Sequence, residues 1–317
     1  MLVNMLPALQ RLSRRDVSLK DSSEKQNVIR GSVDFSMKAA REMAESGIAG
    51  AEMETAAKNL VRDRLKGPVV EFRNLTYFAQ GSVIGGGSNK ILDNISGKFR
   101  PGELHAILGP ASSGRSSLLW ALAGEISPLN STITGSLLVD GVEWNYKKKG
   151  WERCGLVETN NSFHRDLSVR MILTYATQLR RDRRTTPDIV EQIVQNVMIL
   201  THISECSEIS AKNLDPADLR LLAIAEELVN GKTILFVDEP TTNLNSAQTS
   251  KVMKVLEILV SLEYTVICTF HEPTSELFKS LDNIMLLMQG KVIYHGKANN
   301  AIEHFVSEPY KFSIERC

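Results

Sequence analysis

The chain has 317 residues, 43% of them hydrophobic, so it can bury one large core or two smaller ones. Its 37 basic and 37 acidic residues cancel to a formal net charge of zero, which gives no reason to expect a polyanion-binding surface. No apolar run approaches the roughly 18 residues that cross a bilayer, so we expect that this chain does not span a membrane by itself.

The first part of the chain reads as a tail with helices. Residues 1–31 are polar and lack sustained periodicity, which predicts disorder. Within them, Met1 to Arg15 weakly imitates a transit peptide, although we prefer a loose tail. Residues 33–65 carry an Ala-rich helical pattern that Gly47 and Gly50 divide into two helices. We therefore expect a tail with helices over residues 1–66 and one domain over residues 67–317.

The domain opens with a predicted hairpin. Residues 69–78 read as a strand, the Gly-rich residues 81–87 as the hairpin tip, and residues 91–99 as the returning strand. Tyr77, on the first strand, offers an aromatic face on which an adenine base could stack. A purely structural aromatic explains Tyr77 equally well.

The most informative stretch follows the hairpin. A short apolar run, residues 104–108, meets a Gly-rich turn and then a helical pattern that ends near Gly124. This order is typical of a P-loop, in which backbone N–H groups and the helix N-terminus hold a polyphosphate and a hydroxyl reaches Mg²⁺. The candidate nucleotide-binding residues are Gly109, Ser112, Ser113, Gly114, Arg115, Ser116 and Ser117.

Within this loop, Ser116 is the candidate Mg²⁺ ligand, and Arg115 occupies the position that normally carries a phosphate-contacting Lys. Arginine keeps the positive charge and can fork onto phosphate oxygens, but it is longer and planar. The alternative interpretation of the stretch is an ordinary strand–helix turn.

The middle of the chain is predicted to be helical. After a strand over residues 135–141 and a polar loop over residues 157–163, helices are expected at 168–179, 189–200 and 218–229, with no strand signal before Thr233. The basic cluster Arg180, Arg181, Arg183 and Arg184 is interpreted as a solvated helix end rather than a nucleic-acid site. The scattered cysteines, Cys154, Cys206, Cys268 and Cys317, show no metal-ligand spacing and indicate buried, reduced thiols.

Two further apolar strands end in candidate catalytic residues. Residues 233–237 read as a strand buried on both faces, and it ends in Asp238 and Glu239. Because ligands bind at this end of an open α/β sheet, we assign Asp238 to Mg²⁺ and Glu239 to polarising the attacking water. An acidic turn that merely caps the strand is the alternative. Residues 264–270 form the next predicted strand, and His271 at its end could contact a γ-phosphate. The strands 283–288 and 292–294 and a short helix, 299–305, complete the prediction.

These residues resemble the nucleotide-binding domain of an ABC transporter, most closely in the ABCG, or pleiotropic drug resistance, branch. The resemblance covers roughly three quarters of the chain and rests on the blocks ILDNISGKFRPGELHAILGPASSGRSSLLWALAG, DLSVRMILTYATQLR, ILFVDEPTTNLNS and HEPTSELFKSLDNIMLLMQGKVIYHG. It implies an α/β fold: a P-loop NTPase core sheet with an antiparallel β subdomain and a helical subdomain. It also implies ATP and Mg²⁺ as cofactors, at the cytoplasmic face of a membrane. In the terms of this family, residues 109–117 are Walker A, Tyr77 the adenine-stacking aromatic, Asp238 the Walker B carboxylate, Glu239 the catalytic Glu and His271 the switch His.

Three departures from the family pattern stand out. Thr159 replaces the Gln that binds Mg²⁺ and couples to the membrane domain, and Asn245 replaces the Asp that follows Walker B. Asp215-Pro216-Ala217 replaces the Ser-Gly-Gly signature that must approach the partner subunit's γ-phosphate. Pro216 removes a donor N–H, Ala217 adds a methyl group and Asp215 adds negative charge, so this half-site is predicted to be inactive.

The sequence leaves several functional hypotheses open. The first is an ATP-binding domain that works beside an ABCG-type partner domain with an intact signature, with membrane domains on another chain or missing from this one. The second is a catalytically inactive pseudo-ATPase that serves as a structural or regulatory partner, or a fragment of a longer transporter. A soluble ABC protein acting on ribosomes or DNA is disfavoured, because such proteins usually carry paired nucleotide domains. No nucleic-acid partner is expected.

Overall fold

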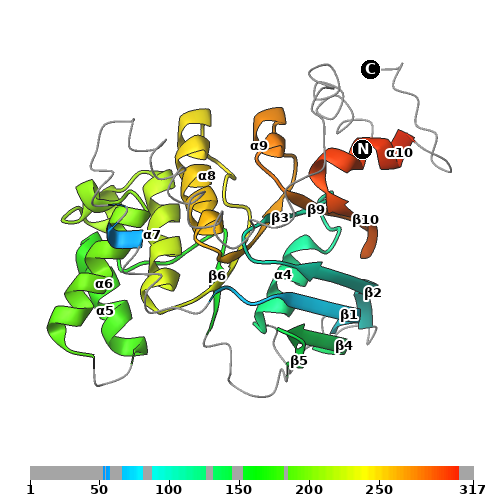
Figure 1. Cartoon of the computed structure of the whole chain (residues 1–317), viewed down its shortest axis with the longest axis horizontal. Helices are drawn as coiled ribbons and strands as arrows, with labels where there is room; N and C mark the ends of the chain where they lie inside the picture. Colours follow the sequence, from blue (N-terminus) through cyan, green and yellow to red (C-terminus); the bar gives the residue numbers. More distant parts are fainter. Residues whose placement is uncertain are drawn as a thin grey trace, which may run out of the picture.

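A mostly parallel sheet lies at the centre of the molecule (Figure 1). The computed structural model describes residues 53, 55–57, 66–80, 88–125, 131–144, 153–181 and 185–306. Within these residues the sheet has six strands in the order β10-β9-β3-β8-β7-β6, and only the β10–β9 pair is antiparallel. The strands are β3 (Leu104–Leu108), β6 (Cys154–Val157), β7 (Ile234–Val237), β8 (Thr265–Phe270), β9 (Asn283–Met288) and β10 (Lys291–Lys297).

Alternate side chains of this sheet enter two different cores. Along β7, Leu235 and Val237 pack in one hydrophobic cluster, while Ile234 and Phe236 pack in the other. Successive residues of a strand point to opposite faces, so a strand covered on both sides must be apolar throughout. The continuous apolar run of β7 therefore follows from its central place in the sheet.

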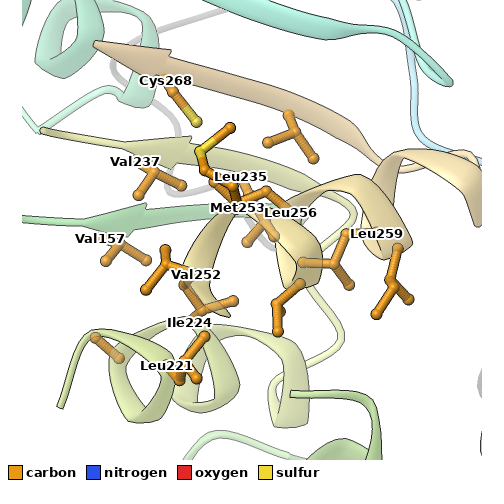
Figure 2. Close-up of a cluster of buried hydrophobic side chains, with 14 of the residues drawn as sticks. Val157, Leu221, Ile224, Leu235, Val237, Val252, Met253, Leu256, Leu259 and Cys268 are labelled. Carbon is orange, nitrogen blue, oxygen red and sulfur yellow. The ribbon is translucent and has the colours of Figure 1, made fainter. Parts of the chain in front are cut away.

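The first cluster is formed with two long helices, α7 (Pro216–Val229) and α8 (Ser246–Ser261), which cover one face of the sheet. Figure 2 shows Leu221 and Ile224 of α7 facing Val252 of α8 beneath the strands. Asn245 begins α8 with a capping box, in which Asn245 and Gln248 each bind the other's backbone N–H.

The second cluster lies between the central sheet and a smaller antiparallel one. The smaller sheet has the order β2-β1-β4-β5, with β1 (Val70–Gln80), β2 (Ser88–Phe99), β4 (Ser131–Val139) and β5 (Val142–Glu143). Helix α4 (Arg115–Ala123) is buried between them, because Leu118 and Leu122 pack in the same cluster as Phe72 of β1 and Phe236 of β7. The helix that follows the P-loop is thereby fixed on both sides.

Two of the remaining helices lie at one end of the molecule. α5 (Val169–Arg180) and α6 (Pro187–Leu200) pack with α7 at the end opposite the antiparallel sheet (Figure 1). α9 (Ser275–Lys279) and α10 (Ala301–Val306) follow β8 and β10, and short 3₁₀ turns occur at Ser204–Cys206, Ala211–Asn213 and Ala298–Asn300. The parallel core sheet, antiparallel sheet and helical region confirm the predicted fold class.

Most predicted elements are confirmed within a few residues, but β5, β6, α8 and α9 were not predicted. β6 contradicts the expectation that no strand precedes Thr233 in the middle of the chain. In the described part of the basic cluster, Arg180 pairs with Glu226 and Glu227, and Arg181 donates to the carbonyl of Val229, so these two residues are not simply solvated. Arg183 and Arg184 lie outside the described residues. The disordered tail, the hairpin tip and most of the predicted 33–65 helices lie outside the described residues.

The cysteines behave as expected where they are described. Cys154, Cys206 and Cys268 are free thiols, and Cys154 and Cys268 are buried. Burial raises the pKa of both buried thiols. They are therefore structural rather than reactive groups, and Cys317 lies outside the described residues.

Candidate functional site

The loop between β3 and α4 has the close backbone approaches of a P-loop. A Cβ added at Gly109 would lie 2.3 Å from the carbonyl oxygen of Leu287. Gly114 precedes α4 with φ 100, and a Cβ there would lie 2.7 Å from Leu92. Both positions therefore require glycine. Ser112 adopts φ 61, a left-handed conformation that costs an ordinary residue about 1–2 kcal/mol. The loop is held in this form by its anchors, including a 3.0 Å hydrogen bond from the Gly290 N–H to the Ser113 carbonyl.

Arg115, the first residue of α4, points back beneath the loop. Its Nη1 donates to the carbonyl oxygens of Gly109 at 2.6 Å and Phe270 at 2.7 Å. Its Nη2 donates to Glu239 Oε1 at 3.1 Å. The side chain is only 7% exposed. Burial lowers the pKa of Arg115 while Glu239 and Asp238 act in the opposite direction, and a guanidinium remains charged throughout.

Asp238, at the end of β7, is surrounded by hydroxyl groups. Ser116 Oγ donates to Asp238 Oδ1 at 3.0 Å, and Thr269 Oγ1 donates to the same oxygen at 2.5 Å. Thr159 Oγ1 lies 3.4 Å from Asp238 Oδ2. The carboxylate is 5% exposed, and these donors offset the cost of burying it. The structure thus brings together the two residues that the sequence assigned to Mg²⁺, Ser116 and Asp238.

Glu239 follows Asp238 with both carboxylate oxygens engaged. Oε1 accepts from Arg115, and Oε2 accepts from Thr242 Oγ1 at 2.9 Å. The Glu239 N–H donates to Thr269 Oγ1 at 2.9 Å, and its φ of 46 is unusual for a residue with a side chain. Such backbone strain persists only where surrounding contacts enforce it, and it is common at functional sites.

His271 and Tyr77 are not drawn into this cluster. His271 directly follows β8, but its side chain is 43% exposed, and its Nδ1 lies 3.8 Å from Glu272 Oε1. Tyr77 is paired with Leu92 on β2, the residue that contacts Gly114. It packs partly buried against the second cluster. Tyr77 is therefore paired with a residue whose side chain packs beside Gly114 of the P-loop.

Three residues that shape the site were not predicted from the sequence. Thr269 bridges Asp238 and the Glu239 backbone, Thr242 holds Glu239, and Arg220 of α7 donates to the Glu158 carbonyl at 2.6 Å. Arg220 is buried, which lowers its pKa, while the charges of Asp238 and Glu239 raise it. Thr269 could have been predicted most easily of the three, since it lies two residues before His271 on a strand that was correctly predicted.

The start of α7 has the opposite character. Asp215 is its N-cap, and Asp215 Oδ1 accepts from the Asp218 N–H at 2.8 Å. Asp215 and Pro216 are exposed, whereas Ala217 is fully buried. The expected obstruction by the Ala217 methyl group is therefore wrong, because that methyl faces the core. Asp215 and Pro216 alone carry the departure from the family pattern.

Comparison with known proteins identifies this arrangement. Residues 92–242 match the family described as ABC transporter. The chain belongs to the ABC transporter family, in its G branch. It is 32% identical to ABC transporter G family member 1 of Dictyostelium discoideum over 235 residues, covering 71% of this chain and 29% of that protein. Protein scarlet of Drosophila melanogaster is 29% identical over 254 residues, which cover 77% of this chain and 37% of that protein.

A solved structure supports the fold. The cbiO1 protein of Clostridium perfringens, described as part of the ABC transporter complex cbiONQ, matches with a TM-score of 0.64 at 24% identity, covering 75% of this chain and 92% of that one. The motifs and fold are those of the ATP-binding domain of an ABCG-type transporter. The matched part of this chain covers only 29% of the length of ABC transporter G family member 1 and 40% of the length of member 21. Among the residues that the structure describes, no helix is long and apolar enough to cross a membrane.

Proposed function

We propose that this chain binds ATP with Mg²⁺ at its own Walker A loop and works beside a different nucleotide domain. In this proposal it lies at the cytoplasmic face of a membrane and couples ATP binding and hydrolysis to transport through membrane domains. The supporting observation is an asymmetry: Ser116, Asp238 and Glu239 converge on the P-loop, whereas the start of α7 exposes Asp215 and Pro216.

The donor set of the P-loop site fits the proposed cofactors. Hydroxyl and carboxylate oxygens are the ligands that Mg²⁺ prefers, and Ser116 and Asp238 supply one of each. A bound Mg²⁺ would neutralise phosphate charge there. Ser113 Oγ is buried with no hydrogen-bond partner among the described residues, so the loop retains an unused polar group. Tyr77 and Ser117 complete the proposed nucleotide contacts.

The resemblance to ABC transporters implies that nucleotide domains work in pairs with transmembrane domains, and that each nucleotide lies between Walker A of one domain and the signature of the other. A homodimer of this chain would set Asp215 and Pro216 against both nucleotides, adding negative charge where phosphate needs donors. A partner with an intact signature would instead complete the site formed by Arg115, Ser116, Asp238, Glu239 and His271. We therefore infer a heterodimer with one working site and one inactive site.

A second candidate function is a pseudo-ATPase that binds nucleotide without turnover. The observation that favours it is the engagement of both Glu239 oxygens, because each oxygen of the proposed base already accepts a hydrogen bond, from Arg115 or from Thr242, in this conformation. The two candidates share nucleotide binding and differ only in hydrolysis, so they can be separated by measuring turnover.

Nucleotide binding is tested by calorimetry of the folded chain with ATP and Mg²⁺. We expect binding that is weaker than in a Lys-containing relative, because the bulkier Arg115 fills the space beneath the loop. Arg115→Lys should tighten it. A folded chain with no detectable binding would contradict the Walker A assignment.

Hydrolysis is tested by measuring turnover of the chain alone and then mixed with an ABCG-type nucleotide domain that carries an intact signature. The proposal expects activity only in the mixture, and its loss when the partner's signature Ser is mutated. Robust hydrolysis by the pure chain would overturn the heterodimer. Nucleotide binding without turnover in either preparation would favour the pseudo-ATPase.

A further inference from the structure

The guanidinium of Arg115 is already committed to protein acceptors. Three of its five N–H donor positions are used: two bonds from Nη1 to the Gly109 and Phe270 carbonyls and one from Nη2 to Glu239. These acceptors come from the P-loop, the end of β8 and the residue after Walker B. Arg115, the proposed phosphate-binding cation, is thus hydrogen-bonded to Glu239, the proposed base.

A bound triphosphate needs the same cation. The P-loop cation reaches the β- and γ-phosphates, and a guanidinium pairs with phosphate or carboxylate oxygens in the same forked geometry. The Arg115–Glu239 ion pair is largely removed from water, because the Arg115 side chain is 7% exposed and the Glu239 side chain 23%. Water therefore does little to compensate either charge when the pair is broken. Glu239 and a γ-phosphate are therefore alternatives for Arg115.

We propose that Arg115 is a charge-exchange residue: it holds Glu239 in the nucleotide-free chain and transfers to the γ-phosphate of a bound nucleoside triphosphate. This inference rests on the proposed function and deepens it. The exchange makes the site discriminate triphosphate from diphosphate, because only the γ-phosphate competes with Glu239. It also releases Glu239 Oε1 as a proton acceptor only when a substrate for hydrolysis is present.

Thr242 holds Glu239 in place independently of Arg115. Its hydroxyl donates to Glu239 Oε2, the oxygen that Arg115 does not contact. The Glu239 backbone is likewise held, since its N–H donates to Thr269. When Arg115 leaves, Glu239 therefore stays in place, and only one of its two oxygens becomes free.

The test compares Glu239→Gln with the unmodified 317-residue chain. Calorimetry measures binding of ADP and of an ATP analogue with a non-hydrolysable imido bridge, both with Mg²⁺. Removing the competing charge should tighten the triphosphate analogue about five- to tenfold and ADP less than twofold. Glu276→Gln, which removes an exposed carboxylate on α9, is the matched control and should change neither affinity.

A double-mutant cycle separates competition from simple charge repulsion. In an Arg115→Lys background, the compact ammonium cannot reach two carbonyls and a carboxylate together, so Glu239→Gln should tighten the analogue less than twofold. Equal tightening in both backgrounds, or equal tightening of ADP and the analogue, would overturn the exchange.

The outcomes distinguish this inference from the proposed function. Nucleotide binding that is unchanged by Glu239→Gln overturns the exchange alone. If no folded form of the chain binds either nucleotide, the proposed function fails as well. Thermal denaturation confirms folding of each variant, and Glu239→Asp, which shortens the side chain by one methylene, replaces Glu239→Gln if that variant does not fold.

Discussion

The P-loop region and the start of α7 are both places where a nucleotide domain of this family handles phosphate, but their charges are arranged differently. Around the P-loop, the buried carboxylate of Asp238 and the partly buried one of Glu239 are matched by two buried guanidinium groups and by the hydroxyls of Ser116 and Thr269. At the start of α7, Asp215 is exposed and caps its own helix.

The difference teaches which nucleotide each region can serve. Under the proposed function, the P-loop region serves the chain's own nucleotide, and it retains a cation, a hydroxyl and a carboxylate beside the loop. Under the same proposal the start of α7 would serve the partner's nucleotide, and its N-terminal N–H groups are approached first by an acidic side chain. The departures from the family pattern would then be concentrated on the surface that serves the partner. The following predictions test whether the two regions are as unequal as their chemistry suggests.

The largest expected effect is on turnover. In the mixture with an intact partner, Glu239→Gln should lower the rate of hydrolysis about 10²- to 10⁴-fold, the usual contribution of a general base. Steady-state phosphate release, measured beside ATP affinity, checks this, and affinity should not weaken. Unchanged turnover would make Glu239 a structural residue, and the P-loop region would then lack the general base that distinguishes it from the start of α7.

The next effect concerns the hydroxyl that links the two carboxylate residues. Thr269→Val keeps the shape of the side chain but leaves a buried Asp238 oxygen with one donor fewer and the Glu239 N–H without its acceptor. We expect the free energy of unfolding to fall by about 1–3 kcal/mol and ATP binding to weaken. Denaturant titration measures the first. Thr265→Val, on the same strand but bonded to the Pro68 carbonyl, is the control that should affect stability without affecting nucleotide.

Acid should also lower the stability of the core sheet through His105, near the start of β3. Burial, the largest cause, lowers the pKa of His105 to about 4, and its Nε2 accepts from the Arg100 N–H at 2.8 Å. The unfolded chain therefore takes up this proton first, and stability is lost as the pH falls from about 6.5 towards 4. Between pH 7 and pH 5 the loss should be about 2 kcal/mol.

His105→Gln, which retains an acceptor for Arg100, should reduce that loss in urea titrations at the two pH values. The pKa of His295 is also lowered by burial, so some acid sensitivity should remain in the variant. The same pH dependence in both proteins would show that His105 does not carry the effect.

Much of the fold could be predicted from the sequence, because its signals are local. β3, β7 and β8 are apolar runs that stop at Gly109, Asp238 and His271, and helix α7 begins at a proline. β6 was missed because it has only four residues, including a glycine and a cysteine, and carries no pattern of its own. α8 was overlooked although its start contains a readable capping box, Asn245 and Gln248.

The site was predicted less completely, because its contacts depend on register between distant strands. Walker-type spacing pointed to Ser116, Asp238 and Glu239, and the structure brings these together. No spacing in the sequence indicates that Arg115 reaches the Phe270 carbonyl, 155 positions away. That contact exists only because β3 and β8 are parallel neighbours with Leu108 opposite Phe270. The burial of Ala217 could likewise not be predicted, because the packing of the helix start against the core decides which of its side chains point inward.

The smallest expected effect lies at the start of α7, where stability and function should separate. Asp215→Ser keeps a side-chain oxygen for the Asp218 N–H, so the free energy of unfolding should change by no more than a few tenths of a kcal/mol. Asp215→Ala removes the cap and should cost about 1 kcal/mol. Although it restores the family Ser, Asp215→Ser should not activate the pure chain, because Pro216 still lacks an N–H. Denaturant titration and phosphate release measure the two properties. Hydrolysis by the Asp215→Ser chain alone would mean that one charge, rather than the backbone at Pro216, silences this region.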